Sequence, residues 1–328
     1  MIPKHQSSPT RPADSCSALA RSAGEPLAGT APLADAWVVI EQPGSWGAKA
    51  LQDAALPDGT GPAIASAAAA AGVGVLLARH PERTLRAGRN QAHRVWVADV
   101  RPGSQRLATG SVGSVAEVAG WDFAAIADGA LPTGQEPMQG EPVGLGPSPA
   151  PLLLVCTQGG RDACCAVIGR ALLIELTQGL QPDRRVQVWE ASHIGGHRFA
   201  PTVLALPTGA VYGRLDATAA GEVLQATARL QVRTGGLRGC TALPPPAQVA
   251  DIAIRERTGE IEVAALRVQA VHQDAGTASV LVAHRDKRTW LVRLRQEPLA
   301  VPRPQSCGGR PEPGLAWAVS SIEEGAYA

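Results

Sequence analysis

The sequence predicts an α/β protein in which one arrangement of strands and helices occurs twice and a smaller α+β region follows. The order strand, helix, strand, hairpin, helix can be read in residues 31–130 and again in residues 151–236. Between them, residues 131–150 are rich in proline and glycine and are typical of a linker. In residues 237–328, three runs of alternating apolar and polar residues follow a short helical pattern, which predicts a small antiparallel sheet beside a helix.

The first repeat follows an N-terminal segment, residues 1–30, whose Ser, Pro, Ala and Arg content predicts a flexible tail with one short helix at 17–22. Cys16 in this tail is expected to be an incidental exposed thiol. Gly72 is placed to end a helix, and Pro102-Gly103 to make a hairpin turn. The predicted strands are 37–40, 73–78, 94–100 and 105–109, and the predicted helices are 62–71 and 115–128.

The second repeat has the same plan, with Pro207-Thr208-Gly209 as its hairpin turn. Its predicted strands are 152–155, 186–189, 203–206 and 210–215, and its helices are 162–178 and 219–232. A crossover between two strands, then an antiparallel hairpin and a helix, is the plan of the thioredoxin fold. We therefore expect tandem thioredoxin-like modules with a small C-terminal α+β region. The first module carries no cysteine and is expected to be a degenerate scaffold, with His80 near the place that His193 takes in the second.

The C-terminal region begins with three prolines, Pro244 to Pro246, ahead of its helical pattern. A helix is expected at 247–257 and strands at 261–272, 278–284 and 289–295. The last thirty residues are rich in proline and include Cys307 and Trp317. Cys240 and Cys307 could form a redox pair, although buried cysteines without a role are the commoner case.

Four potential metal ligands occur at the ends of strands in the second repeat. Cys156 ends one strand and Cys165 lies near the start of the following helix, while His193 and His197 lie on the loop after the next strand. Two thiols and two imidazoles at the ends of adjacent strands are what a metal centre needs.

The spacing of these residues favours one kind of metal centre. Zinc modules usually place two to four residues between paired cysteines, whereas Cys156 and Cys165 enclose a wider loop. Gly195-Gly196, between the histidines, lets the backbone approach a bulky group. A [2Fe-2S] cluster held by two thiolates and two imidazoles fits both features. A mononuclear zinc site with the same ligands, or ordinary buried cysteines beside polar histidines, are the alternatives.

The chain also resembles a known family at these residues. The run VCTQGGRDACCA, followed by HIGGHRFA, closely resembles the sucrase/ferredoxin-like family of thioredoxin-like ferredoxins, with weaker likeness from CSALAR to PEPGLAW. The resemblance implies that Cys156 and Cys165 are the thiolate ligands of a [2Fe-2S] cluster and that His193 and His197 are its imidazole ligands. Cys164 lies one position short of the second thiolate, and Gln158 stands where many relatives carry a histidine.

The expected function is therefore one-electron transfer. We expect an electron carrier rather than an enzyme, and its partner would be an unknown reductase or electron acceptor. Neutral imidazoles in place of thiolates predict a potential of about −150 to +300 mV. A ligating imidazole keeps a ring N–H that can leave, so electron uptake can be coupled to proton uptake. Thiol redox catalysis is a second hypothesis, but thioredoxin chemistry needs a C-x-x-C motif, and the adjacent pair Cys164-Cys165 would form only a strained disulfide.

Composition and other side chains exclude several classes of function. A net charge of +1 with 18% charged residues gives no electrostatic footprint for nucleic acid or for a membrane surface. Asp162 and Glu190 lack the aromatic platform of a glycoside hydrolase. Six irregularly spaced cysteines, no long apolar run and no signal-peptide core in residues 1–15 lead us to expect a cytoplasmic protein. Four arginines near the ligand loops could dock an acidic redox partner or form a solvated rim: Arg161, Arg184, Arg185 and Arg198.

Overall fold

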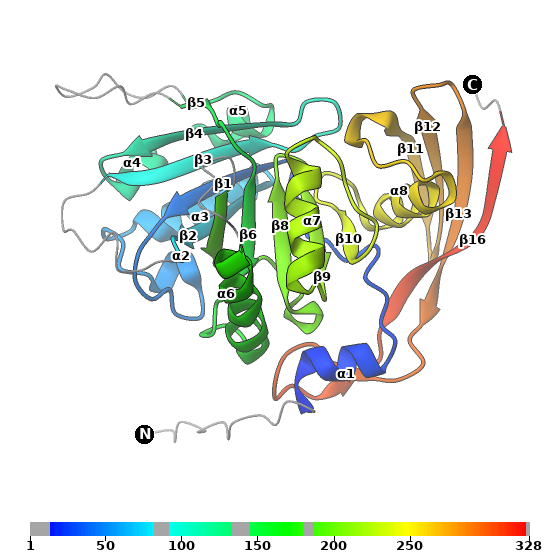
Figure 1. Cartoon of the computed structure of the whole chain (residues 1–328), viewed down its shortest axis with the longest axis horizontal. Coiled ribbons are helices and arrows are strands. Elements are labelled where there is room, and N and C mark those ends of the chain that lie inside the picture. The colour runs from blue at the N-terminus through cyan, green and yellow to red at the C-terminus, as the bar shows by residue number, and fades with distance from the viewer. Residues whose placement is uncertain (1–13, 82–91, 133–144, 180–186, 326–328) are drawn as a thin grey trace.

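The computed structural model in Figure 1 describes residues 14–81, 92–132, 145–179 and 187–325. It is a mixed α/β fold with a ten-stranded mixed sheet, a separate four-stranded antiparallel sheet and a two-stranded ribbon. The helices are α1 (Cys16–Ser22), α2 (Ala50–Asp53), α3 (Thr60–Ala70), α4 (Val115–Ala119), α5 (Phe123–Ala127), α6 (Arg170–Gly179), α7 (Ala217–Thr227) and α8 (Pro245–Thr258). None of the helices in the described parts of the chain is both long and apolar enough to cross a membrane.

The large sheet has the order β10-β9-β8-β6-β7-β2-β1-β3-β4-β5. Its strands are β1 (Ala36–Glu41), β2 (Val73–Arg79), β3 (His93–Asp99), β4 (Arg106–Val112), β5 (Gly146–Pro147), β6 (Leu152–Cys156), β7 (Gln187–Ala191), β8 (Thr202–Leu206), β9 (Ala210–Gly213) and β10 (Leu237–Cys240). In each half the first strand pairs parallel with the second and antiparallel with the third, and the third pairs antiparallel with the fourth. The halves join where β2 and β7 pair antiparallel, with Ala78 opposite Ala191.

Side-chain alternation divides each strand of the large sheet between two cores. In β6, Leu153 and Val155 face a core shared with α6 and α7, whereas Leu152, Leu154 and Cys156 face the other side. Figure 1 shows α6 and α7 on the same side of the second half of the sheet. The opposite face is one continuous core across both halves. Each fully buried leucine contributes on the order of 2 kcal/mol to folding, so this all-apolar strand holds Cys156 in a fixed place.

The C-terminal region is an antiparallel sheet of order β11-β12-β13-β16, covered on its inner face by α8. Its strands are β11 (Leu266–Asp274), β12 (Thr277–His284), β13 (Thr289–Pro298) and β16 (Leu315–Gly325). Between β13 and β16, residues 299–314 form what we call the C-terminal strap, which contains the short strands β14 (Arg303–Pro304) and β15 (Pro311–Glu312). The strap runs back beside α1 (Figure 1).

Several predicted elements differ in the structure, each for a local reason. The helix expected at 115–128 is two helices, because Asp122 caps a new start at α5. The helix expected at 219–232 ends at Thr227, and Leu230 has a left-handed φ of 53°. Strand β16 was not predicted, and residues 133–144 of the predicted linker lie outside the described residues.

The expectation of an exposed thiol at Cys16 is wrong. Cys16 is 0% exposed. It begins α1, which is capped by the Ser15 side chain and packs against the short 3-10 helix His197–Phe199. The N-terminal segment from residue 14 onward is therefore part of the surroundings of the predicted metal ligands.

Candidate metal centre

The Cys156 thiol lies at the end of β6, where a turn of π-helix packs directly against the strand. The π-helical turn Cys165–Gly169 precedes α6, so the helix expected at 162–178 begins with a wider turn than an α-helix has. A side chain on Gly169 would place its Cβ 2.1 Å from the Cys156 carbonyl oxygen. The absence of a side chain at Gly169 therefore lets the helix start approach the strand end closely enough to bring Cys165 to Cys156.

The two thiols of Cys156 and Cys165 interact with each other. The pKa of Cys156 is lowered because the Cys165 thiol donates to it, and the His193 side chain lowers it further against the opposing effect of burial. The pKa of Cys165 is raised, first by its hydrogen bond to Cys156 and then by burial. A bound metal would take both as thiolates, because metal ligation deprotonates cysteine.

The histidine loop is fixed from both sides. The Gln158 side chain accepts a hydrogen bond from the His193 backbone N–H at 2.7 Å, so Gln158 holds this loop. The imidazole rings of His193 and His197 lie side by side, with centroids 5.4 Å apart. The Nε2 atom of His197 lies 2.5 Å from the Gln305 carbonyl oxygen of the C-terminal strap and 3.6 Å from the nearer Asp162 carboxylate oxygen.

The Nδ1 atoms of both histidines are buried and have no hydrogen-bond partner among the described residues. A buried polar atom left without a partner costs about 1–3 kcal/mol, and metal ligation would satisfy both. The chemistry of the donor set fits as well, because two thiolates and two neutral imidazoles suit iron–sulfur and zinc centres. The structure thus brings together Cys156 with Cys165 and His193, and His193 with His197.

Arg238 lies against the histidine loop. Its side chain is buried, and it donates to the Gly195 carbonyl at 2.8 Å, to the Thr30 hydroxyl at 3.0 Å and to the Thr30 carbonyl. Gly196 has φ +71°, and a Cβ there would lie 2.4 Å from an Arg238 nitrogen. Burial, and then the neighbouring Arg198, lower the pKa of Arg238 to about 9, which leaves it protonated at neutral pH. These hydrogen bonds all go to neutral oxygens.

A second group of potential ligands includes Asp162, whose carboxylate also lies 3.6 Å from His197 Nε2. The ligand atoms of Cys16, Asp162, Cys164 and Cys307 all lie within 4.8 Å of one another. The adjacent residues Cys164 and Cys165 therefore face different neighbours. Cys307 was considered only as a redox partner of Cys240, but its sulfur lies beside Cys164 and Cys16. No sequence motif could have joined Cys16 and Cys307 to Cys164, because they lie 148 and 143 positions from it.

The other features that the sequence singled out have structural roles. Glu190 is 0% exposed and accepts ion pairs from Arg79 and Arg170 and a hydrogen bond from Thr157, so it is not free to act as a catalytic acid. Arg198 pairs with Glu25, which also pairs with Arg303, and this removes it from the predicted docking rim. Arg184 and Arg185 lie outside the described residues.

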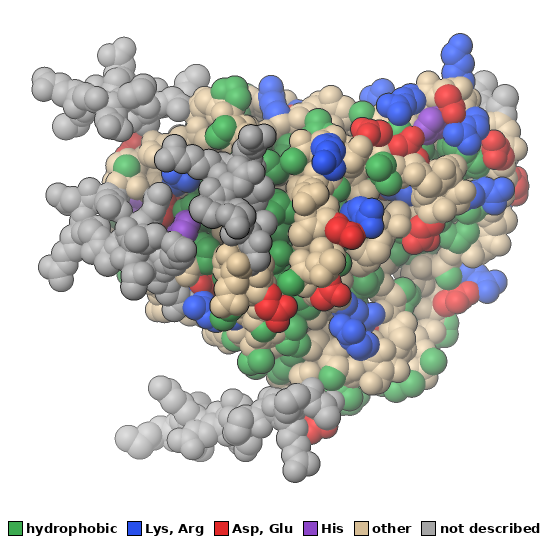
Figure 2. Space-filling model, in the orientation of Figure 1, with side chains coloured by type: hydrophobic (Ala, Val, Ile, Leu, Met, Phe, Trp, Pro, Cys, Tyr) green, Lys and Arg blue, Asp and Glu red, His purple; other side chains and the backbone are tan. Residues whose placement is uncertain are grey.

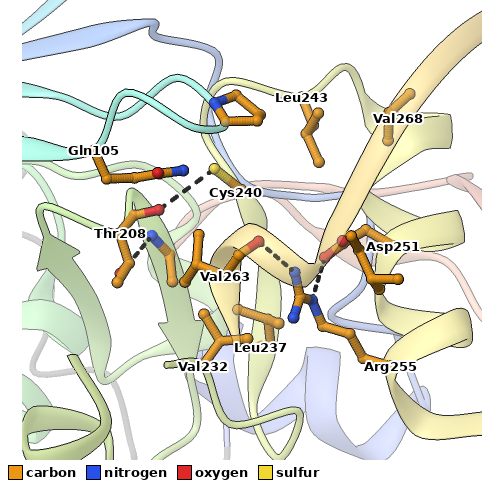
Figure 3. Close-up of a pocket in the computed structure, with 13 residues that line it drawn as sticks. Gln105, Thr208, Val232, Leu237, Cys240, Leu243, Asp251, Arg255, Val263 and Val268 are labelled. Atoms are coloured by element: carbon orange, nitrogen blue, oxygen red, sulfur yellow. Dashed lines mark hydrogen bonds and ion pairs between the residues drawn. The ribbon is translucent and has the colours of Figure 1, made fainter. Parts of the chain in front are cut away.

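Neither the surface in view nor the cavity in Figure 3 points to a further ligand. Figure 2 shows Lys and Arg side chains interspersed with Asp and Glu, with no field of one sign on that face. Figure 3 shows a pocket beside Cys240, Asp251 and Arg255. The volume of this pocket is about 30 Å³. That volume suits a water molecule, not an organic substrate.

One family model matches most of the chain. The sequence model of the sucrase/ferredoxin-like family matches residues 27–239, which include Cys156, Cys165, His193 and His197. No curated protein and no solved structure matches the chain. Because the family match covers more than half of the 328 residues, the chain belongs to the sucrase/ferredoxin-like family.

Proposed function

We propose that this member of the sucrase/ferredoxin-like family is a one-electron carrier. It would hold a [2Fe-2S] cluster with four ligands: Cys156, Cys165, His193 and His197. The observation that carries the proposal is the pair of buried, unpartnered Nδ1 atoms on adjacent imidazoles. When bound, the cluster supplies the one-electron chemistry, and the protein supplies ligation, burial and charge. The repeated strand order also supports a tandem thioredoxin-like scaffold, since both halves follow that plan.

The protein's own groups would set the properties of this centre. The Cys156 and Cys165 thiols sit at 1% exposure each, which shields a bound group from water. The Gln305 carbonyl accepts from His197 Nε2 and so would fix the ring with Nδ1 free to ligate. The buried Arg238 cation lies under the backbone between the two histidines, and it would favour uptake of an electron at the centre.

The proposal also includes coupling between electron uptake and proton uptake. Nε2 of a ligating imidazole keeps a proton that can leave when the metal centre is oxidised. His197 Nε2 donates to the Gln305 carbonyl of the strap, and the His193 side chain hydrogen-bonds to Cys156. The exchangeable proton would be carried by His193 or His197.

The experiment is anaerobic purification of the full chain with iron and sulfide analysis. About two irons and two sulfides per chain are expected, together with an EPR signal that appears on one-electron reduction and carries nitrogen hyperfine coupling from the imidazoles. Cys165→Ala should lose the iron. Its matched control, Cys164→Ala, should keep it, because Cys164 faces Cys16 and Cys307 instead.

Two results would contradict the carrier proposal. Zinc bound by two sulfurs and two nitrogens, without sulfide, would assign the same four ligands to a mononuclear zinc site. A reversible Cys156–Cys165 disulfide in metal-free protein would favour thiol redox chemistry.

A further inference from the structure

We propose that Cys16, Cys164, Cys307 and Asp162 form a second metal site, which binds one zinc ion. The site is distinct from the four ligands of the proposed cluster. It draws one thiol from α1, one thiol and the carboxylate from the loop before the π-helical turn, and one thiol from the C-terminal strap.

The distances between the donor atoms suit a tetrahedral ion. The three sulfurs form a triangle with sides of 3.2, 3.5 and 3.7 Å. Sulfurs bonded to one zinc at about 2.3 Å in tetrahedral geometry lie about 3.8 Å apart. The Asp162 oxygens lie 3.8 Å from the Cys16 sulfur and 3.4 Å from the Cys307 sulfur, close to the sulfur–oxygen edge of about 3.6 Å that the same geometry requires.

A triangle of near-equal sides favours a metal over a disulfide. A disulfide brings two sulfurs to about 2.05 Å and leaves the third thiol alone, whereas here all three are equivalent neighbours. The donor atoms also lie too close together for a two-iron cluster, since all are within 4.8 Å of one another. The ligands of such a cluster are divided between two metal atoms. A set of three thiolates with one carboxylate fits Zn²⁺ better than Cu⁺, since the soft Cu⁺ ion selects thiolates and thioethers alone.

The surroundings hold the donors in place. The Asp162 carboxylate accepts backbone N–H bonds from Cys164 at 2.8 Å and from Cys307 at 2.9 Å, and the Ser17 hydroxyl donates to the Cys164 sulfur at 3.3 Å. These bonds stabilise negative charge at the site. Cys16 and Cys164 are buried and Cys307 is half-buried.

The site would tie three distant segments together next to the proposed cluster. Asp162 and the strap, through Gln305, both reach His197. A zinc ion here would fix the strap, and with it the carbonyl that orients the His197 ring. The role is structural, and the ion itself carries no electrons because Zn²⁺ has no redox chemistry.

The test is zinc, iron and sulfide analysis of the full chain produced in zinc-supplemented medium. One zinc per chain is expected in the wild type. Cys16→Ser and Cys307→Ser should each lower it at least tenfold with iron and sulfide unchanged. Cys240→Ser is the matched control, because the Cys240 sulfur lies elsewhere, near the Val100 and Thr208 carbonyls, and it should keep the zinc.

X-ray absorption at the zinc edge of the wild type needs no variant and so does not depend on variant folding. Three sulfurs at about 2.3 Å and one oxygen at about 2.0–2.2 Å are expected. Two sulfurs and two nitrogens would place the zinc on Cys156, Cys165, His193 and His197 and overturn this proposal. Absence of zinc from supplemented wild type, or a native disulfide among Cys16, Cys164 and Cys307, would overturn it as well. Absence of iron with zinc lost only in Cys16→Ser and Cys307→Ser would overturn the carrier proposal alone.

Discussion

Replacing Arg238 by methionine should lower the reduction potential of the proposed cluster. A [2Fe-2S] centre with two thiolates and two neutral imidazoles is formally neutral when oxidised and gains one negative charge on reduction. Arg238 is a buried cation whose charge interacts with Cys156 and Cys165. It therefore stabilises the reduced form more than the oxidised form.

The size of the effect follows from the contacts of the guanidinium. Arg238 binds the Gly195 carbonyl at 2.8 Å, and Gly195 is two residues from each histidine. At a separation on the order of 8 Å and an effective dielectric constant of about 20, the attraction is about 2 kcal/mol. For one electron this corresponds to about 90 mV. Arg238→Met should therefore shift the potential downward by tens of millivolts, up to roughly this amount.

The assay is a potentiometric titration of wild type, Arg238→Met and Arg238→Lys, with iron content measured on each. Arg238→Lys keeps the charge and should stay near the wild-type potential, which separates charge from packing. Arg238→Met also leaves the Gly195 and Thr30 carbonyls without a donor, at about 1–3 kcal/mol of stability each, so thermal unfolding is recorded in parallel. A Met variant that retains two irons and titrates at the wild-type potential would refute the electrostatic reasoning.

Two further predictions concern the helix start and the histidine proton. Gly169→Ala would force a Cβ to within 2.1 Å of the Cys156 carbonyl, so it should cost about 1–3 kcal/mol in unfolding free energy and reduce iron content. Gly221→Ala in α7, where a Cβ meets nothing within 4 Å, should keep the iron and raise the unfolding free energy by up to about 1 kcal/mol, and equal behaviour of the two variants would contradict the close approach. The reduction potential should fall as pH rises, because electron uptake brings proton uptake at His193 or His197; a potential that is flat from mildly acidic to alkaline pH would reject proton coupling.

The strands near the ligands were predictable because their apolar runs are local. The run Leu152–Val155 predicted β6 to within one residue, and the turn at Pro207-Thr208-Gly209 predicted the β8–β9 hairpin. The repeated order of elements predicted the matching strand orders of the two halves. Alternation and turn residues act over a few positions, so a single sequence carries this information.

The contacts of the termini could not be predicted in the same way. The N-terminal segment has the composition of a mobile tail, yet Cys16 and Ala20 are fully buried. The proline-rich end of the chain reads as irregular, yet it contains the eleven-residue strand β16. Cys16 contacts Cys164, 148 positions away, and β16 forms by pairing with β13. No local pattern specifies either contact.

The adjacent cysteines show why neighbouring residues in one motif can serve different centres. Cys164 caps the π-helical turn and Cys165 begins it, so their side chains leave the backbone in different directions, one toward Cys16 and the other toward Cys156. Asp162, between the two groups, accepts from Cys307 and lies 3.6 Å from His197. The family match at 27–239 contains the four proposed cluster ligands but neither Cys16 nor Cys307. The segments outside the match therefore supply support for His197 that the ligand motif alone does not contain.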